Sequence, residues 1–223
     1  MTTQITTITT PLIFNVSVNC YLITSGDGYI LIDTGMTSKR QAIEEGLENA
    51  GCQPGDLKLI IITHGDFDHS GNAAYLREKF GAPIAMHPDD AGMVENGDMT
   101  WNRNKPNFVI RTIFSLLFKL KEADRFIPDI LIEEGDQLSE FGIQAQVISI
   151  PGHSRGSIGI LTSSGDLICG DLFGNLKQPE LWSIIDEAPA AHASIEKLGG
   201  YTIKTVYPGH GEPFPMDSLI QPD

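Results

Sequence analysis

Four side chains that can bind a metal ion are packed into one short motif, THGDFDH. The imidazole and carboxylate groups of this motif lie within six residues of one another, at His64, Asp66, Asp68 and His69. The motif directly follows the apolar run at 57–62, which is typical of a buried strand. Histidine and aspartate are ordinary ligands of transition metals, so the motif indicates a metal site at a strand tip. A short acidic turn with one structural histidine is the alternative.

The spacing within the motif suggests how its side chains could converge. In an extended chain, residues two apart point the same way, so His64, Asp66 and Asp68 could share one side of the segment. His69 would need a turn to join them. Gly65 supplies the backbone freedom for such a bend.

Three later positions add candidate ligands. Pro-Gly-His occurs twice after an apolar run, placing His153 and His210 on rigid turns just beyond predicted strand ends. Asp171 follows the apolar run 167–169 and Gly170. Each alone would more often be a turn residue, but together with the first motif they complete the inventory of a two-metal site.

Two groups of predicted strands must position these residues. A meander at 5–33 precedes a helix at 38–50, the strand that ends at 64, a helix at 72–80, a strand at 83–86 and a helix at 88–95. The second group has strands at 130–132, 143–150, 157–162, 166–169 and 204–207, with a helix at 190–198. This pattern predicts an α/β fold of two face-to-face sheets with helices outside, a four-layer sandwich forming one domain over 1–223.

Composition excludes some functions. The net charge of −14 disfavours nucleic acid as a partner, because nucleic-acid binding requires basic residues that neutralise phosphates. The chain begins without a signal-peptide pattern and has no apolar run of about 18 residues, so we expect no stable membrane insertion and a cytoplasmic protein. Cys20, Cys52 and Cys169 form no CxxC pair, which suits a reducing compartment.

The motifs together resemble the metallo-β-lactamase superfamily along nearly the whole chain. The matching pieces are IDTG at 32–35, THGDFDHSG at 63–71, PGHS at 151–154, GD at 170–171 and PGHG at 208–211. The resemblance implies an αββα sandwich of two mixed sheets with a binuclear site at one edge. It also implies one metal at His64, Asp66 and His153, a second at Asp68, His69 and His210, and Asp171 bridging them.

One residue departs from the pattern of that family. The family usually has His-x-His-x-Asp-His, and Asp66 stands where the second histidine is expected. Two divalent ions, zinc first, are the expected cofactors, but a carboxylate is a harder ligand that moves preference toward iron or manganese. The motif also resembles flavodiiron oxygen reductases, a redox alternative. Those proteins need a flavin domain for which 223 residues leave no room, so hydrolysis comes first.

The resemblance implies hydrolysis of a small ester, thioester or lactone, with a phosphodiester as the alternative substrate. Two cations lower the pKa of a bridging water from about 15.7 toward roughly 7, which makes hydroxide available as the nucleophile. Asp68, which the resemblance makes both ligand and proton acceptor, is expected to orient the water. Asp33 is expected to hydrogen-bond a ligand or a nearby loop, or alternatively to cap the turn that follows it.

The segment 101–127 interrupts the alternation of strands and helices. Six basic residues against two acidic ones make it positive within an acidic chain, and an apolar stripe with helical spacing runs through it. We expect a helical lid that recognises a small, anionic substrate through Arg103, Arg111, Phe114 and Phe118. A helix packed on the core or in a homodimer interface is the alternative.

Overall fold

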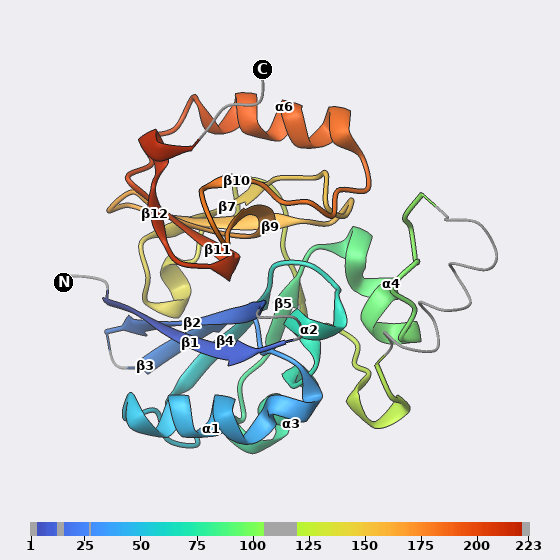
Figure 1. The fold of residues 1–223 in the computed structure, drawn as a ribbon. Coiled ribbons are helices and arrows are strands. Elements are labelled where there is room, and N and C mark those ends of the chain that lie inside the picture. Colours follow the sequence, from blue (N-terminus) through green and yellow to red (C-terminus); the bar gives the residue numbers. More distant parts are fainter. Residues whose placement is uncertain (1–3, 13–15, 27, 105–119, 220–223) are drawn as a thin grey trace.

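The computed structural model describes residues 4–12, 16–26, 28–104 and 120–219. Two β-sheets face one another, with helices on the outer face of each (Figure 1). Helix α6 (Ala188–Leu198) covers one sheet, while α1 (Arg40–Asn49) and α3 (Ala73–Phe80) cover the other. This is the four-layer αββα sandwich that the alternation of elements predicts.

The first sheet is mixed. Its first three strands are antiparallel and the remaining three run parallel to the third. In spatial order they are β1 (Gln4–Pro11), β2 (Ser17–Ser25), β3 (Gly28–Ile32), β4 (Leu57–Ile62), β5 (Ile84–Met86) and β6 (Ile130–Leu131). The expectation that 130–132 belongs with the second group of strands was wrong, because β6 pairs with β5. A two-residue strand carries too little pattern to show its partner.

The second sheet is also mixed, with one parallel pair, β11 and β9. In spatial order its strands are β12 (Phe214–Pro215), β11 (Thr205–Gly211), β9 (Asp166–Asn175), β8 (Ile158–Thr162) and β7 (Ala145–Ser149), with β10 (Glu180–Leu181) on β9. Strands β9 and β11 run further than expected, so Asp171 and His210 lie inside strands and not beyond their ends. Register shifts around Pro208 let β11 continue past a proline.

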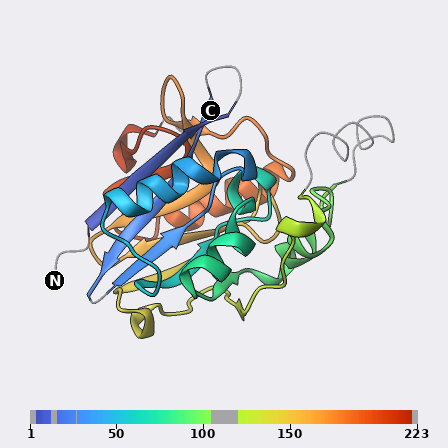
Figure 2. The same ribbon diagram turned by 90° about the horizontal axis from the view of Figure 1, so that it is seen from below.

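Helix boundaries follow the local signals. Gly81 ends α3 and Gly97 ends α4 (Pro88–Asn96), both in the left-handed conformation that favours glycine. In α1, Ile43 and Leu47 are buried four residues apart, the spacing of one helical face. Figure 2 shows α1, in blue, lying across the strands of the first sheet.

Three apolar layers hold the sandwich together. Ile60 and Ile62 of β4 pack toward the helices of the first sheet, while Leu59 and Ile61 pack between the two sheets. Because both faces of β4 are buried, its sequence is an almost continuous apolar run. A third layer lies between the second sheet and α6.

Candidate metal centre

Seven side chains from both sheets meet at one edge of the sandwich. His64 and Asp66 follow β4, and Asp68 and His69 lie on the short helix α2 (Phe67–Ser70). Residues 153, 171 and 210 come from the loop after β7, from β9 and from β11. Three overlapping groups could each hold a cation: His64, Asp66 and His153; Asp68, His69 and His210; and His64, His69 and Asp171.

The backbone reaches this arrangement differently from the sequence-based expectation. Asp66 is extended, with ψ of 147°, but the chain then turns into α2. The expectation of an extended segment through Asp68 was therefore wrong. A helical turn places Asp68 and His69 next to each other on the side of the second group, whereas His64 and Asp66 face the first.

Distances show two triads with a shared carboxylate. In the first triad, Asp66 Oδ2 lies 2.9 Å from His153 Nε2 and 3.6 Å from His64 Nε2. In the second, Asp68 Oδ2 lies 3.8 Å from His210 Nε2. Asp171 stands between them: its Oδ1 is 3.3 Å from His69 Nε2, and its Oδ2 is 3.1 Å from His210 Nε2 and 4.0 Å from His64 Nε2.

Each histidine is held from behind through Nδ1. Two of these nitrogens contact backbone carbonyls: that of His153 lies 2.6 Å from Ile184 O, and that of His210 lies 2.7 Å from Ser17 O. A carbonyl oxygen only accepts, so Nδ1 carries the proton and the Nε2 lone pair is left for a ligand.

Asp33 holds the other two imidazoles. Its Oδ2 lies 2.9 Å from His69 Nδ1 and accepts a 2.8 Å bond from Thr63 Oγ1. Thr63 Oγ1, having donated to Asp33, can accept from His64 Nδ1 at 3.0 Å. Asp33 also accepts from the Thr63 NH at 2.9 Å and has φ of +60°, an uncommon conformation for a residue with a side chain. One carboxylate thus orients ligands of both triads.

Glycine forms the floor of the site. A Cβ at Gly209 would lie 2.1 Å from Asp171 Oδ1 and 2.7 Å from His69 Cε1. A Cβ at Gly170, where φ is +49°, would lie 2.5 Å from Thr63 Oγ1. The Asp171 carboxylate and the imidazoles can meet only because the backbone there carries no side chain.

Sequence reasoning missed Asp90, a buried acid on α4. Its Oδ2 accepts bonds from the Gly65 NH at 3.0 Å and Ser154 Oγ at 2.6 Å, and its Oδ1 accepts from the Gly156 NH at 2.9 Å. Asp90 therefore ties the loop of His64 to the loop of His153. An acid in the first turn of a helix is common, so no local signal marked it.

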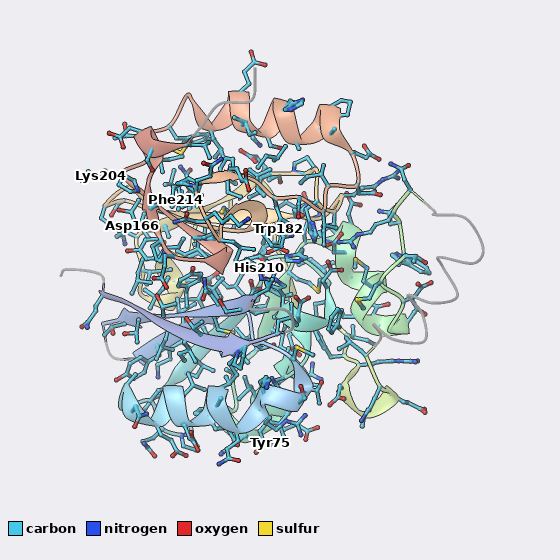
Figure 3. All side chains as sticks on the ribbon, viewed as in Figure 1. Tyr75, Asp166, Trp182, Lys204, His210 and Phe214 are labelled. Carbon is cyan, nitrogen blue, oxygen red and sulfur yellow. The ribbon has the colours of Figure 1, made fainter. Side chains whose placement is uncertain are left out.

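Trp182 was not among the predicted site residues either. Its ring stacks on that of His210, with centroids 4.5 Å apart and planes at 15°. Figure 3 labels the two residues close together. It follows β10, a two-residue strand that the sequence did not predict. The stacked indole ring limits rotation of the His210 imidazole, which is also held by the bond between its Nδ1 and Ser17 O.

Arg103 alone of the predicted lid residues is described, because Arg111, Phe114 and Phe118 lie outside the described residues. Its guanidinium forms a two-pronged ion pair with Asp66: Nη1 is 3.0 Å from Oδ1 and Nη2 is 3.2 Å from Oδ2. The basic segment thus reaches the site. Because 105–119 lie outside the described residues, the expectation that 101–127 forms a helical lid, and its alternatives of core packing or a homodimer interface, stay predictions.

Charges in the site are strongly coupled. Burial acts to raise the carboxyl pKa of Asp66, but Arg103 and His153 outweigh it and hold that pKa far below its usual range. Burial raises the pKa of Asp68, and the neighbouring Asp171 adds to the effect. Burial lowers the pKa of His64, so this imidazole is neutral, as a ligand must be.

Several buried atoms at the centre are left with bonding capacity. Within the described part of the chain, His64 Nε2, His69 Nε2 and Asp171 Oδ1 are buried and have no hydrogen-bond partner. Leaving buried polar atoms unpaired is costly, and native proteins rarely do so without a reason. Imidazole nitrogens and carboxylate oxygens aimed at one point fit divalent cations.

Comparisons with known proteins agree with this geometry. A model of the Metallo-beta-lactamase superfamily matches residues 14–210. The chain belongs to that superfamily. A probable metallo-hydrolase, MJ0888 from Methanocaldococcus jannaschii, is 31% identical over 211 residues, covering 89% of this chain and 90% of the relative. The superfamily member described here is a metal-dependent hydrolase, which confirms the sequence-based identification.

Other relatives have named activities. Hydroxyacylglutathione hydrolase GloC of Haemophilus influenzae is 31% identical over 64% of this chain and 60% of its own length. Acyl-coenzyme A thioesterase MBLAC2 of Bos taurus is 26% identical over 91% of this chain and 76% of its own length. This superfamily member spans about six-tenths of the length of GloC and of the mammalian metallo-beta-lactamase domain-containing protein 1.

A solved structure supports the fold. TTHA1623 in a di-iron-bound form aligns with a TM-score of 0.71 and 25% identity, covering 95% of both chains. The αββα prediction is therefore confirmed. Among the helices of the described residues, none has the length and hydrophobicity needed to cross a membrane.

Proposed function

We propose that this enzyme holds two divalent cations, one in each triad with Asp171 between them, and hydrolyses a small thioester, ester or lactone. The observation that carries the proposal is the convergence of four imidazole Nε2 atoms and three carboxylates at one edge of the sandwich, where several buried polar atoms have no hydrogen-bond partner among the described residues. Bound in these positions, two cations would lower the pKa of a water molecule and polarise the carbonyl of the substrate.

The residues of the chain would do the remaining work. Asp68 Oδ2 lies beside His210 Nε2 in the second triad, and the residue is 7% exposed. We assign it to orient the attacking water and accept its proton, because burial and Asp171 raise the pKa of its carboxyl group and make it a better base than an ordinary aspartate. Asp33 would keep His69 oriented directly and His64 oriented through Thr63.

A thioester is the substrate class we favour. Two relatives are named for acyl-glutathione and acyl-coenzyme A hydrolysis, and MBLAC2 matches most of this chain. The positive charge of 101–127 favours a small anionic substrate. Arg103 borders the site, whereas Arg111, Phe114 and Phe118 remain proposed lid residues.

Zinc is the metal we propose, with iron as the second candidate. The aspartate at 66 offers a hard oxygen ligand, and the structural neighbour TTHA1623 was solved with two irons. Manganese shares the preference for oxygen ligands. A diiron protein with oxygen reactivity would be the corresponding alternative function.

We also propose that the enzyme acts in the cytoplasm. Cys20, Cys52 and Cys169 are all buried and unbridged, which suits a reducing compartment.

The test is elemental analysis of protein purified without added metal, followed by thioester, ester, lactone and phosphodiester substrates. We expect about two metal ions per chain and thioester turnover that His210→Ala abolishes. The control Arg77→Met removes an exposed arginine of the Asp129 ion pair and should keep full activity. Bound metal without turnover on any substrate class, or oxygen reduction by bound iron, would contradict hydrolysis.

A further inference from the structure

Arg103 occupies an unusual position for a charged side chain. Its side chain and that of Asp66 are each 15% exposed, and both prongs of the guanidinium face that carboxylate. A desolvated charge is stable only beside a partner of opposite sign. The Nε of Arg103 is buried without a hydrogen-bond partner among the described residues, so Asp66 is the contact that holds the guanidinium.

The backbone around Arg103 is fixed on both sides. Asn102 has φ of +54°, and its Nδ2 donates to Asp89 O at 3.2 Å. The Asn104 NH donates to Asp186 Oδ2 at 3.0 Å, across the site from α4. Asparagine adopts this left-handed conformation more readily than most residues, and its side-chain bond keeps the turn in place. The guanidinium is therefore delivered to Asp66 by the fold.

The two triads consequently differ in charge. In the first, the negative charge of Asp66 is balanced by Arg103. In the second, Asp68 contributes a negative charge and Asp33 stands directly behind His69. Among the described residues, no lysine or arginine forms an ion pair with Asp68, Asp33 or Asp171, so nothing equivalent offsets the second triad.

We propose that Arg103 makes the two cation positions unequal, so that the Asp68–His69–His210 position fills first and the His64–Asp66–His153 position second. The guanidinium neutralises Asp66 and repels a cation bound beside it. It also contacts both oxygens of Asp66, so Oδ2 is shared between Arg103 on one side and His153 and His64 on the other. Arg103 thus acts through Asp66 and sets the metal affinity of the first triad. This inference rests on the proposed function in one respect only, which is that the site holds two cations.

Isolating each position tests the order of filling. His153→Ala leaves the second triad intact, and His210→Ala leaves the first. Zinc binding by each variant is measured by equilibrium dialysis and metal analysis. We expect His153→Ala to bind zinc at least about tenfold more tightly than His210→Ala, since a unit charge within a few Å at an effective dielectric of about 20 changes affinity by tenfold or more. Equal affinities, or the reverse order, would overturn the inference.

Removing the charge tests the cause. In the His210→Ala background, Arg103→Met should raise zinc affinity about tenfold. In the His153→Ala background it should change affinity by less than about threefold. Arg103→Lys keeps the charge without the fork, so zinc affinity should stay near that of the parent. Arg103→Gln gives a second neutral variant if methionine impairs folding.

Two outcomes distinguish failure of this inference from failure of the proposed two-metal function. The control Arg77→Met removes an arginine from an exposed Asp129 pair and should leave both zinc affinities unchanged. A fall in affinity when Arg103 is made neutral would show that it serves Asp66 only as a scaffold, and would overturn the inference while the proposed function stands. Wild-type protein that binds no divalent cation would overturn both.

Discussion

The two triads contain the same residue types but are built in different ways. Asp68 and His69 come from one short buried helix, and the third ligand, His210, is stacked against Trp182. His64, Asp66 and the loop of residue 153 are tied together by Asp90 and bordered by Arg103. Two positions with the same types of side chain can therefore be expected to behave differently, because the groups behind these side chains differ in charge and in packing.

Asp171 is the one proposed ligand that the triads would share, and its removal should have the largest effect. Asp171→Ala should leave less than one metal ion per chain and lower kcat/KM on the order of a thousandfold, because both positions lose a negative oxygen. Metal analysis and thioester kinetics measure this. Asp171→Asn, which keeps the shape, is the control for packing. Two metal ions in the alanine variant would show that the triads are independent.

Replacing Asp33 should weaken metal binding at the two triads to different extents, because Asp33 bonds His69 directly and His64 only through Thr63. Asp33→Asn removes the charged acceptor behind His69, and loss of such a partner costs about ten- to a hundredfold in metal affinity. We expect most of the loss at the second triad, because His64 contacts Asp33 only through Thr63. Zinc titrations of Asp33→Asn in the His153→Ala and His210→Ala backgrounds give the comparison, and equal losses would contradict it.

Asp66→His should sharpen the charge difference. The change replaces a hard carboxylate with a neutral imidazole, so competitive loading with zinc and manganese should shift toward zinc by about tenfold. It also leaves Arg103 buried beside a neutral ligand, so total occupancy of the first position should fall. Adding Arg103→Met should restore that occupancy. Unchanged metal selectivity would contradict the claim that the Asp66 carboxylate moves the preference of the site away from zinc.

Asp90 should affect stability more than metal choice. Asp90→Asn disrupts bonds to Gly65, Ser154 and Gly156, and one unsatisfied buried group costs about 1–3 kcal/mol. Thermal unfolding of metal-free protein measures the loss. The exposed Asp217→Asn is the control. A variant as stable as the wild type would show that the two loops of the first triad do not depend on this carboxylate.

Glu134 lies outside the site and should give the smallest effect, one that is independent of metal. Burial acts to raise its pKa, but bonds from Lys197 and the Ser149 NH outweigh burial and lower it. A lowered pKa means that the ion pair stabilises the fold above the usual pKa of glutamate and is lost as pH falls through the folded-state value. Unfolding of Glu134→Gln should differ from wild type at pH 7 and converge with it in acid. A metal-dependent difference would contradict this assignment.

The sequence predicts which side chains gather at the candidate site better than it predicts their surroundings. His64, Asp66, Asp68 and His69 stand in one motif after an apolar strand, so their proximity could be inferred locally. The turn of α2 could not, because extended and helical paths both suit four polar residues. Asp171 and His210 were expected at strand ends, and the irregular pairing of β9 with β11 that extends both strands depends on contacts between them.

Residues that act across long stretches of chain were the hardest to predict. Asp90 and Ser154 are 64 positions apart, and Arg103 reaches Asp66 over 37. Neither pair has a spacing or composition that distinguishes it from ordinary surface charges. Only the packing of α4 and of the segment 101–104 against the metal centre brings them together.

The absence of a side chain at Gly209 restricts how this enzyme can diversify. Any larger residue there would collide with Asp171 and His69, so every descendant that keeps this cluster of side chains must keep glycine at this position. Arg103 and Trp182 contact Asp66 and His210 through their side chains and not through a backbone approach, so we expect these two positions to tolerate exchange better than position 209. A saturation library at 209 should consequently return glycine alone among active clones, while libraries at 103 and 182 return many residues with altered selectivity.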